Sequence, residues 1–182
     1  MSGIEKGETA LATFGGGCYW CTEAMFQRLR GVVGIVSGFS DGSVVDPTYE
    51  AVCAGTTGHA EVIQVEYDPA VISYEQIIKV HMGTHDPTTL NAQGGDVGTQ
   101  YRSTILWRTE EEREMIEGVL EEMKDVYDQK IVTEVKEFEV FYAAPDYHQN
   151  YYNENAQKGY CEVVISPKLA KFRKKFSEFL VE

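Results

Sequence analysis

Hydrophobic and polar positions alternate most clearly in residues 59–67. Residues 60, 62, 64 and 66 fall on one face of a strand with this period, and residues 61, 63, 65 and 67 fall on the other. The second face carries Glu61, Ile63, Val65 and Tyr67. We therefore expect a strand whose apolar face is buried, with one carboxylate at the start of that face.

The pattern of apolar and polar residues predicts further strands and helices along the chain. Short apolar, β-branched or glycine-bounded runs predict strands at residues 11–14, 32–39 and 101–108. Helices are predicted at residues 19–29, and from the capping box of Ser73 and Gln76 through residue 81. A polar loop follows the second strand, around residues 41–47. After residue 108 we expect a long acidic helix capped by Thr109 and Glu112, and then a strand near residues 135–141. A loop-rich region is expected over residues 143–161. The last predicted helix starts at Ser166-Pro167, and its apolar stripe consists of Leu169, Phe172, Phe176 and Leu180.

The order of the first six elements is β-α-β-β-α-β, which is the split βαβ or ferredoxin-like pattern. This order predicts an α+β protein, with a two-layer α/β sandwich and a loop-rich C-terminal extension. Neither an internal repeat nor a linker interrupts the pattern. We therefore expect one domain over residues 1–182.

Composition narrows the setting in which the chain works. No apolar run is long enough to cross a membrane, and residues 1–6 lack the basic and apolar segments of an export signal. A cytoplasmic location is therefore the default expectation. The formal net charge of -13 disfavours nucleic acid and anionic membranes as partners. No long exposed apolar seam is evident, so we expect a monomer.

A candidate nucleophile, Cys18, follows three glycines at a predicted strand-to-helix junction. A thiol at a helix N-terminus meets unpaired N–H groups and the positive end of the helix dipole, and both favour the reactive thiolate. Tyr19 and Trp20 come next and are well placed to wall a pocket beside the sulfur, although aromatic rings are also common core residues. The competing interpretation is that Cys18 is a small buried hydrophobe.

The other three cysteines allow more than one function for the Cys18 region. Cys21 forms a Cys-x-x-Cys pattern with Cys18, which also suits a thiol–disulfide oxidoreductase or half of a zinc site. A zinc site needs a second close pair of ligands, which the isolated Cys53 and Cys161 do not supply, so we predict no metal. Cys53 lies in an apolar setting and is expected to be buried. Cys161 lies in a polar stretch that is typical of a mobile loop. Such a loop can bring a thiol to a distant active site, so Cys161 is either a second redox cysteine or a surface thiol without a role.

Glu61 is the carboxylate of greatest interest because it shares its strand face with apolar residues. Burial would raise its pKa and keep it protonated, so that it could act as a proton donor. Alternatively, it lies at the strand end, solvated or paired with His59. Tyr49 and Tyr101 border predicted loops, where a phenol either donates to a substrate oxygen or simply packs.

These residues together resemble a known family, the A-type peptide-methionine sulfoxide reductases, over nearly the whole chain. No single segment is specific, but seven occur in the family's order. The matching segments are residues 17–20 with Glu23, 46–53, 57–61, 85–87, 98–103, 146–149 and 159–161.

The resemblance implies a reaction and a set of site residues. Cys18 would attack the sulfur of methionine sulfoxide, Glu61 would deliver a proton to the sulfoxide oxygen, and Cys18 would become a sulfenic acid. Because the sulfur is chiral, only one epimer is expected to react, and the resemblance implies that it is the S epimer, free or peptide-bound. No bound cofactor is implied. The residues implied to bind the substrate are Tyr19 and Trp20 around the S-methyl group, Tyr49 and Tyr101 at the oxygen, and Asp96 through the polar network.

The resemblance also implies that a second cysteine condenses with the sulfenic acid, and that thioredoxin or another dithiol reduces the resulting disulfide. Cys161 matches the family's usual resolving position. The chain departs from the family at Tyr19, where phenylalanine is usual, and at Cys21, where many relatives have glycine. Residues one helical turn apart have Cβ atoms roughly 5–6 Å apart, and a disulfide needs about 3.5–4.5 Å. We therefore favour Cys161 as the resolving cysteine and keep Cys21 as an alternative or a relay.

Overall fold

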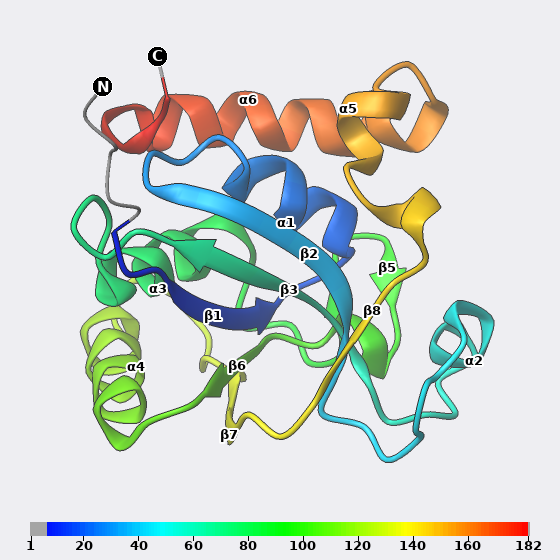
Figure 1. Ribbon diagram of the computed structural model, residues 1–182, viewed down its shortest axis with the longest axis horizontal. Helices are drawn as coiled ribbons and strands as arrows, with labels where there is room; N and C mark the ends of the chain where they lie inside the picture. The colour runs from blue at the N-terminus through cyan, green and yellow to red at the C-terminus, as the bar shows by residue number, and fades with distance from the viewer. Residues whose placement is uncertain (1–6, 182) are drawn as a thin grey trace.

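The computed structural model describes residues 7–181 and has an α+β architecture, as predicted (Figure 1). Residues 1–6, on which the expected absence of an export signal rests, lie outside the described part. No helix within residues 7–181 has the length and apolar character needed to cross a membrane. The strands are β1 (Ala10–Gly15), β2 (Val32–Ser40), β3 (Ala60–Tyr67), β4 (Ala92–Gln93), β5 (Asp96–Val97), β6 (Thr104–Trp107), β7 (Glu134–Glu137) and β8 (Phe141–Ala143). The helices are α1 (Tyr19–Phe26), α2 (Tyr49–Cys53), α3 (Tyr74–Thr84), α4 (Glu110–Met123), α5 (Tyr151–Asn155) and α6 (Ser166–Lys175).

The main sheet has six strands in the order β7-β6-β1-β3-β2-β8. Its four inner strands pair antiparallel, with Phe14 of β1 opposite Ile63 of β3 and Phe39 of β2 opposite Glu61. Glu61 therefore lies near the start of a strand that has neighbours on both sides. All of its strand-face partners in the alternating pattern are buried.

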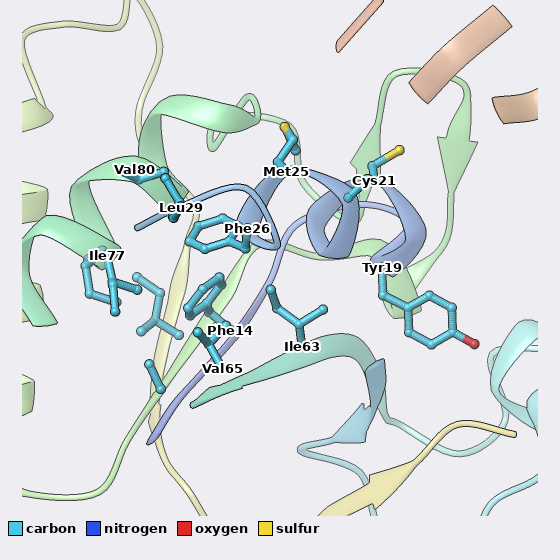
Figure 2. Close-up of a cluster of buried hydrophobic side chains, with 14 of the residues drawn as sticks. Phe14, Tyr19, Cys21, Met25, Phe26, Leu29, Ile63, Val65, Ile77 and Val80 are labelled. Atoms are coloured by element: carbon cyan, nitrogen blue, oxygen red, sulfur yellow. The ribbon is translucent and has the colours of Figure 1, made fainter. Parts of the chain in front are cut away.

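The core lies between this sheet and helices α1 and α3, and Figure 2 shows part of it. The ring of Phe14 on β1 lies 4.8 Å from that of Phe26 on α1 and 4.4 Å from that of His81 on α3. Both helices therefore cover the same face of the sheet. Burying a side chain such as Phe14 or Phe26 stabilises the fold by about 1.5–3 kcal/mol.

Helix α6 lies along α1 on the side away from the sheet (Figure 1). Leu169 and Phe172 from the predicted apolar stripe are buried there. The α-helix ends at Lys175, before Phe176, and Leu180 instead forms an isolated β-bridge with Leu29. The C-terminal segment is thus fastened to both ends of α1, which starts at the candidate nucleophile.

Two local predictions were wrong, and one short helix was missed. The strand expected near residues 135–141 is two strands, β7 paired parallel with β6 and β8 paired with β2 at the opposite edge of the sheet. Between them the Phe138 N–H donates to the carbonyl of Trp107 at 2.8 Å, and the Arg108 guanidinium lies 3.9 Å from the Phe138 ring centroid. The strand expected from residue 101 begins at Thr104, because Thr99–Tyr101 forms a 3-10 turn. Helix α2 occupies the region after the predicted polar loop and is capped by Thr48, whose hydroxyl accepts from the Ala51 N–H at 3.1 Å.

Arg102 bonds to residues of four separate segments of the chain. Its guanidinium lies 2.8 Å from an oxygen of Asp41 and 3.0 Å from an oxygen of Glu134. It also donates to the carbonyls of Thr99 and Gly58 at 2.9 and 3.0 Å. Arg102 is 7% exposed, so water does not replace these partners if the side chain is lost.

We expect Arg102→Ala to lower the free energy of unfolding by about 3 kcal/mol, because it leaves buried acceptors and carboxylates without a partner. Urea unfolding followed by circular dichroism measures this change. The matched control is Lys79→Ala, which removes an exposed i,i+4 pair with Glu75 and should cost less than about 1 kcal/mol. Equal losses in the two variants would contradict the prediction.

Candidate functional site

A tight turn brings the end of β1 to the start of α1 and places Cys18 between them. Cys18 is the N-cap of α1, with an extended backbone, and is 8% exposed. Gly17 has a φ of 85°, a conformation that glycine adopts without strain. A Cβ on Gly15 would lie 2.2 Å from the carbonyl oxygen of Glu61. The glycines are therefore required for the turn to pass directly against β3.

Glu61 lies at the N-terminus of α1. Its side chain accepts a hydrogen bond from the Tyr19 N–H at 3.0 Å, and the residue is 2% exposed. Burial raises the pKa of Glu61 to about 8, although the hydrogen bond from Tyr19 works in the opposite direction. The carboxyl is therefore mostly protonated at neutral pH. The His59 ring instead contacts the Gly42 N–H at 3.0 Å and the Val44 carbonyl at 2.7 Å, so the alternative pairing of Glu61 with His59 is wrong.

Cys18 and Cys21 form a buried pair in which the Cys18 thiol donates to the Cys21 sulfur. Burial raises the pKa of Cys18 well above its usual range, and the Trp20 N–H at the helix N-terminus opposes this only in part. The helix N-terminus therefore does not lower the pKa of Cys18 below its ordinary value, because desolvation outweighs it. The hydrogen bond from Cys18 lowers the pKa of Cys21 to about 7. The pair thus loses its first proton from Cys21.

Two phenols lie near the carboxyl. Burial raises the pKa of Tyr49 and of Tyr101, and the charge of Glu61 adds to both shifts. Each phenol therefore stays protonated and able to donate at neutral pH. Tyr49 also forms a side-chain hydrogen bond with Cys53, which is partly exposed rather than buried as expected.

Aromatic rings wall the site on the side of the C-terminal segment. The Tyr19 hydroxyl lies 2.9 Å from Nδ1 of His148, which is 2% exposed. Trp20 stacks on Tyr151 with ring centroids 3.7 Å apart and an interplanar angle of 7°. The ring of Tyr49 lies 4.2 Å from that of His148. His148 therefore connects Tyr19, Trp20 and Tyr49, and sequence reasoning missed it as a site residue although residues 146–149 formed one of the matching segments.

The two remaining predicted site residues are Asp96 and Cys161. The Tyr160 hydroxyl donates to Asp96 at 2.8 Å and lies 3.9 Å from the Cys21 sulfur. Cys161 is fully buried in a π-helical turn, Cys161–Ile165, that runs into α6. The expected mobile polar loop is therefore wrong, because Cys161 packs into the apolar core. Burial raises the pKa of its thiol.

A glutamate on α1 holds the C-terminal wall in place. Glu23 is 1% exposed, and its carboxylate accepts from the Asn150 N–H at 2.8 Å and the Tyr151 N–H at 3.3 Å, at the start of α5. These bonds occupy backbone donors that a helix start leaves unpaired. Within residues 7–181, no group of three His, Cys, Asp or Glu side chains is arranged to hold a metal ion.

Comparisons with known proteins agree with this geometry. Residues 10–180 match the family model described as peptide methionine sulfoxide reductase. The chain is 52% identical over 168 residues to the peptide methionine sulfoxide reductase MsrA of Saccharolobus solfataricus, covering 92% of this chain and 95% of that one. The structure of Mxr1 from Saccharomyces cerevisiae in reduced form is similar, with a TM-score of 0.80 and 33% identity, covering 88% of this chain and 95% of Mxr1. Mxr1 in complex with Trx2 has the same fold, with a TM-score of 0.58 and 24% identity, covering 83% of this chain and 92% of that one.

The raised pKa of Glu61 predicts how stability depends on pH. The native state keeps a proton that the unfolded chain releases above about pH 4.5, the ordinary value for glutamate. The stabilisation from that proton is complete below pH 4.5 and is lost as the pH rises to about 8. One such proton changes the free energy of unfolding by at most about 1.4 kcal/mol per pH unit.

Urea unfolding of wild type and Glu61→Gln at pH values across this window tests the expectation. Wild-type stability should fall with pH more steeply than that of Glu61→Gln, whose amide cannot ionise. Glu66→Gln, on the same strand but partly exposed, should follow the wild-type slope. Parallel curves for wild type and Glu61→Gln would refute the burial effect.

Proposed function

The chain belongs to the peptide methionine sulfoxide reductase family and reduces methionine sulfoxide to methionine, and from that premise we propose that Cys18 is its nucleophile and Glu61 its proton donor. One observation carries the assignment: a buried carboxyl, protonated at neutral pH, lies at the helix N-terminus that Cys18 caps. A sulfoxide sulfur is a weak electrophile until its oxygen receives a proton or strong hydrogen bonds. A proton donor in a site without bulk water supplies this activation.

The first step forms a bond between Cys18 Sγ and the substrate sulfur while Glu61 protonates the substrate oxygen. The Cys18 proton passes to Cys21, to which the Cys18 thiol already donates. The oxygen then transfers to Cys18 and methionine leaves, so that methionine sulfoxide and a thiol become methionine and a sulfenic acid. Tyr49 and Tyr101 keep their protons and donate to the oxygen as its charge develops.

The aromatic wall gives this site its stereochemical preference. Tyr19 and Trp20 surround the S-methyl group, and the bond from Tyr19 to His148 fixes the orientation of the first ring. A site that holds the methyl group on one side and the oxygen on the other accepts one arrangement around sulfur. We assign the S epimer as the substrate, free or peptide-bound.

A second cysteine then condenses with the sulfenic acid and releases water. We propose Cys161 as the cysteine that finally carries the disulfide, with Cys21 as a relay from Cys18. Two features support a relay: Cys21 is the cysteine hydrogen-bonded to Cys18, and its charge acts on the pKa of Cys161. Asp96 supports the relay by holding the Tyr160 hydroxyl beside Cys21.

Thioredoxin, or another dithiol, is the proposed reductant of that disulfide, and the protein needs no bound cofactor. The complex of the yeast relative Mxr1 with Trx2 supports a partner of this kind. We propose a cytoplasmic monomer made of one domain over residues 1–182. The antiparallel order β6-β1-β3-β2 supports assigning its two-layer core to the split βαβ, ferredoxin-like type.

We expect wild type to consume only the S epimer of a blocked methionine sulfoxide, with dithiothreitol as reductant, and Cys18→Ser to consume neither. Glu61→Gln should lower the rate of methionine formation by about 100-fold, because the proton donor is lost. Chromatography that separates the two remaining sulfoxide epimers and quantifies the methionine formed measures both. Reduction of insulin disulfides by a wild type that ignores both epimers would favour the thiol–disulfide oxidoreductase alternative.

Cys161→Ser should form one equivalent of methionine per chain and then recycle poorly with thioredoxin, because the disulfide stays between the two inner cysteines. Burst amplitude and steady-state rate with a thioredoxin system separate the two effects. Cys53→Ser, which alters a cysteine outside the relay, is the matched control and should keep the steady-state rate. Normal thioredoxin-dependent turnover by Cys161→Ser would overturn its assignment.

A further inference from the structure

One lysine of α6 reaches the sulfur of Cys21. The Lys168 ammonium lies 3.9 Å from Cys21 Sγ, across the contact between α6 and α1. Cys21 is 3% exposed, and in Figure 2 its sulfur points away from Phe26 and the apolar cluster. A cation therefore lies beside a sulfur from which water is almost excluded.

An ammonium at this position favours one ionisation state of the sulfur. A thiolate gains Coulomb energy from a nearby cation, and the gain is larger where water is excluded. After the hydrogen bond from Cys18, the positive charge of Lys168 and the nearby Tyr160 hydroxyl also lower the pKa of Cys21, against the effect of burial. Burial raises the pKa of each of the other cysteines, Cys18, Cys53 and Cys161.

We propose that Lys168 is a positioning residue that keeps Cys21 ionised beside Cys18, so that Cys21 makes the first disulfide of the catalytic cycle. The inference rests on the proposed function, which supplies the sulfenic acid. Between the two steps Cys21 releases to solvent the proton that it took from Cys18. Its thiolate then attacks Cys18 Sγ, the S–S bond forms and the S–O bond breaks. The hydroxide leaves as water with a proton from Glu61, which is reprotonated from solvent between the two steps. Cys18 is reduced from sulfenic acid to disulfide, and Cys21 is oxidised from thiolate to disulfide.

Titratable groups from several elements surround Cys21 and interact electrostatically with its sulfur. Lys168 is the cation among them, while Asp96 and Glu61 are the carboxyl groups. Protonated Glu61 carries no charge at neutral pH, so Lys168 and Asp96 are the two charges of opposite sign that act on the pKa of Cys21. The full set is Cys18 before α1, Glu61 on β3, Asp96 on β5, Tyr160 and Cys161 at the π-helical turn, and Lys168 on α6.

The groove beside Lys168 offers a matched control. Lys168 and Lys171 both line a groove of about 250 Å³ between α6 and the C-terminal ends of α1 and α3. Lys171 is exposed, and among the described contacts its ammonium does not touch a cysteine. A change at Lys171 therefore alters the charge of the groove without altering the partner of the sulfur.

The direct test is the ultraviolet absorbance of the thiolate against pH, in a Cys18→Ser background where Cys21 is the most acidic cysteine. We expect Lys168→Gln to raise the midpoint by about one pH unit, which is about a tenfold smaller thiolate fraction near neutral pH. Lys168→Arg, which keeps the charge, and Lys171→Gln should leave the midpoint where it is in the parent. Equal midpoints in Lys168→Gln and Lys171→Gln would overturn the proposal.

The second test uses full chains that are otherwise wild type, with one equivalent of methionine sulfoxide and no reductant. Peptide mapping without reduction should find the Cys18–Cys21 disulfide. Its formation should be about five- to tenfold slower in Lys168→Gln near pH 7 and should recover as the pH rises. A rate that is unaffected at every pH would also overturn the role of Lys168. Failure of wild type to form methionine would instead refute the proposed function, and the titration of Cys21 does not depend on that outcome.

Discussion

The hydrogen bond from the Tyr19 N–H to Glu61 is the contact on which the rest of the site depends. A buried carboxyl needs a donor, and the first turn of a helix needs an acceptor, so each group satisfies the other. The bond is possible because the chain turns against β3 at Gly15, where a side chain would collide with the backbone of Glu61. The distance between the acid and the cysteine is therefore set by backbone geometry, not by flexible side chains.

The C-terminal third of the chain completes a site that the N-terminal strands and helix begin. Glu23 of α1 holds the start of α5, and His148 and Tyr151 contact the two aromatic residues that follow Cys18. The Tyr19 hydroxyl, where the family usually has phenylalanine, is thus used in a buried hydrogen bond rather than directed at the substrate. Loosening the C-terminal segment would open the aromatic wall without moving Glu61 or Cys18.

Sequence reasoning succeeded where a local pattern reports a local environment. The alternation of β3 predicted a buried face with Glu61 on it, and the capping box of Ser73 and Gln76 is present in the structure. Sequence reasoning failed where contacts between residues far apart in the chain determine the environment of a side chain. Cys161 lies in a polar stretch of sequence, yet the packing of α6 on α1 buries it. The contact between Lys168 and Cys21 joins residues 147 positions apart, and neither neighbourhood carries a sign of it.

The π-helical turn at Cys161–Ile165 has a consequence for the geometry of the C-terminal segment. A π turn contains one residue more than an α turn, so the Ser166 N–H bonds to the carbonyl of Cys161 five residues earlier. Deleting one residue from this turn would restore a regular α-helix through α6, but would rotate everything before it by about 100°. Cys161 would then leave the core with its chemistry intact. The extra residue of the π turn thus determines which side of the helix Cys161 faces. In homologous chains that differ here by one residue, the cysteine would have the same neighbours in sequence but different neighbours in space.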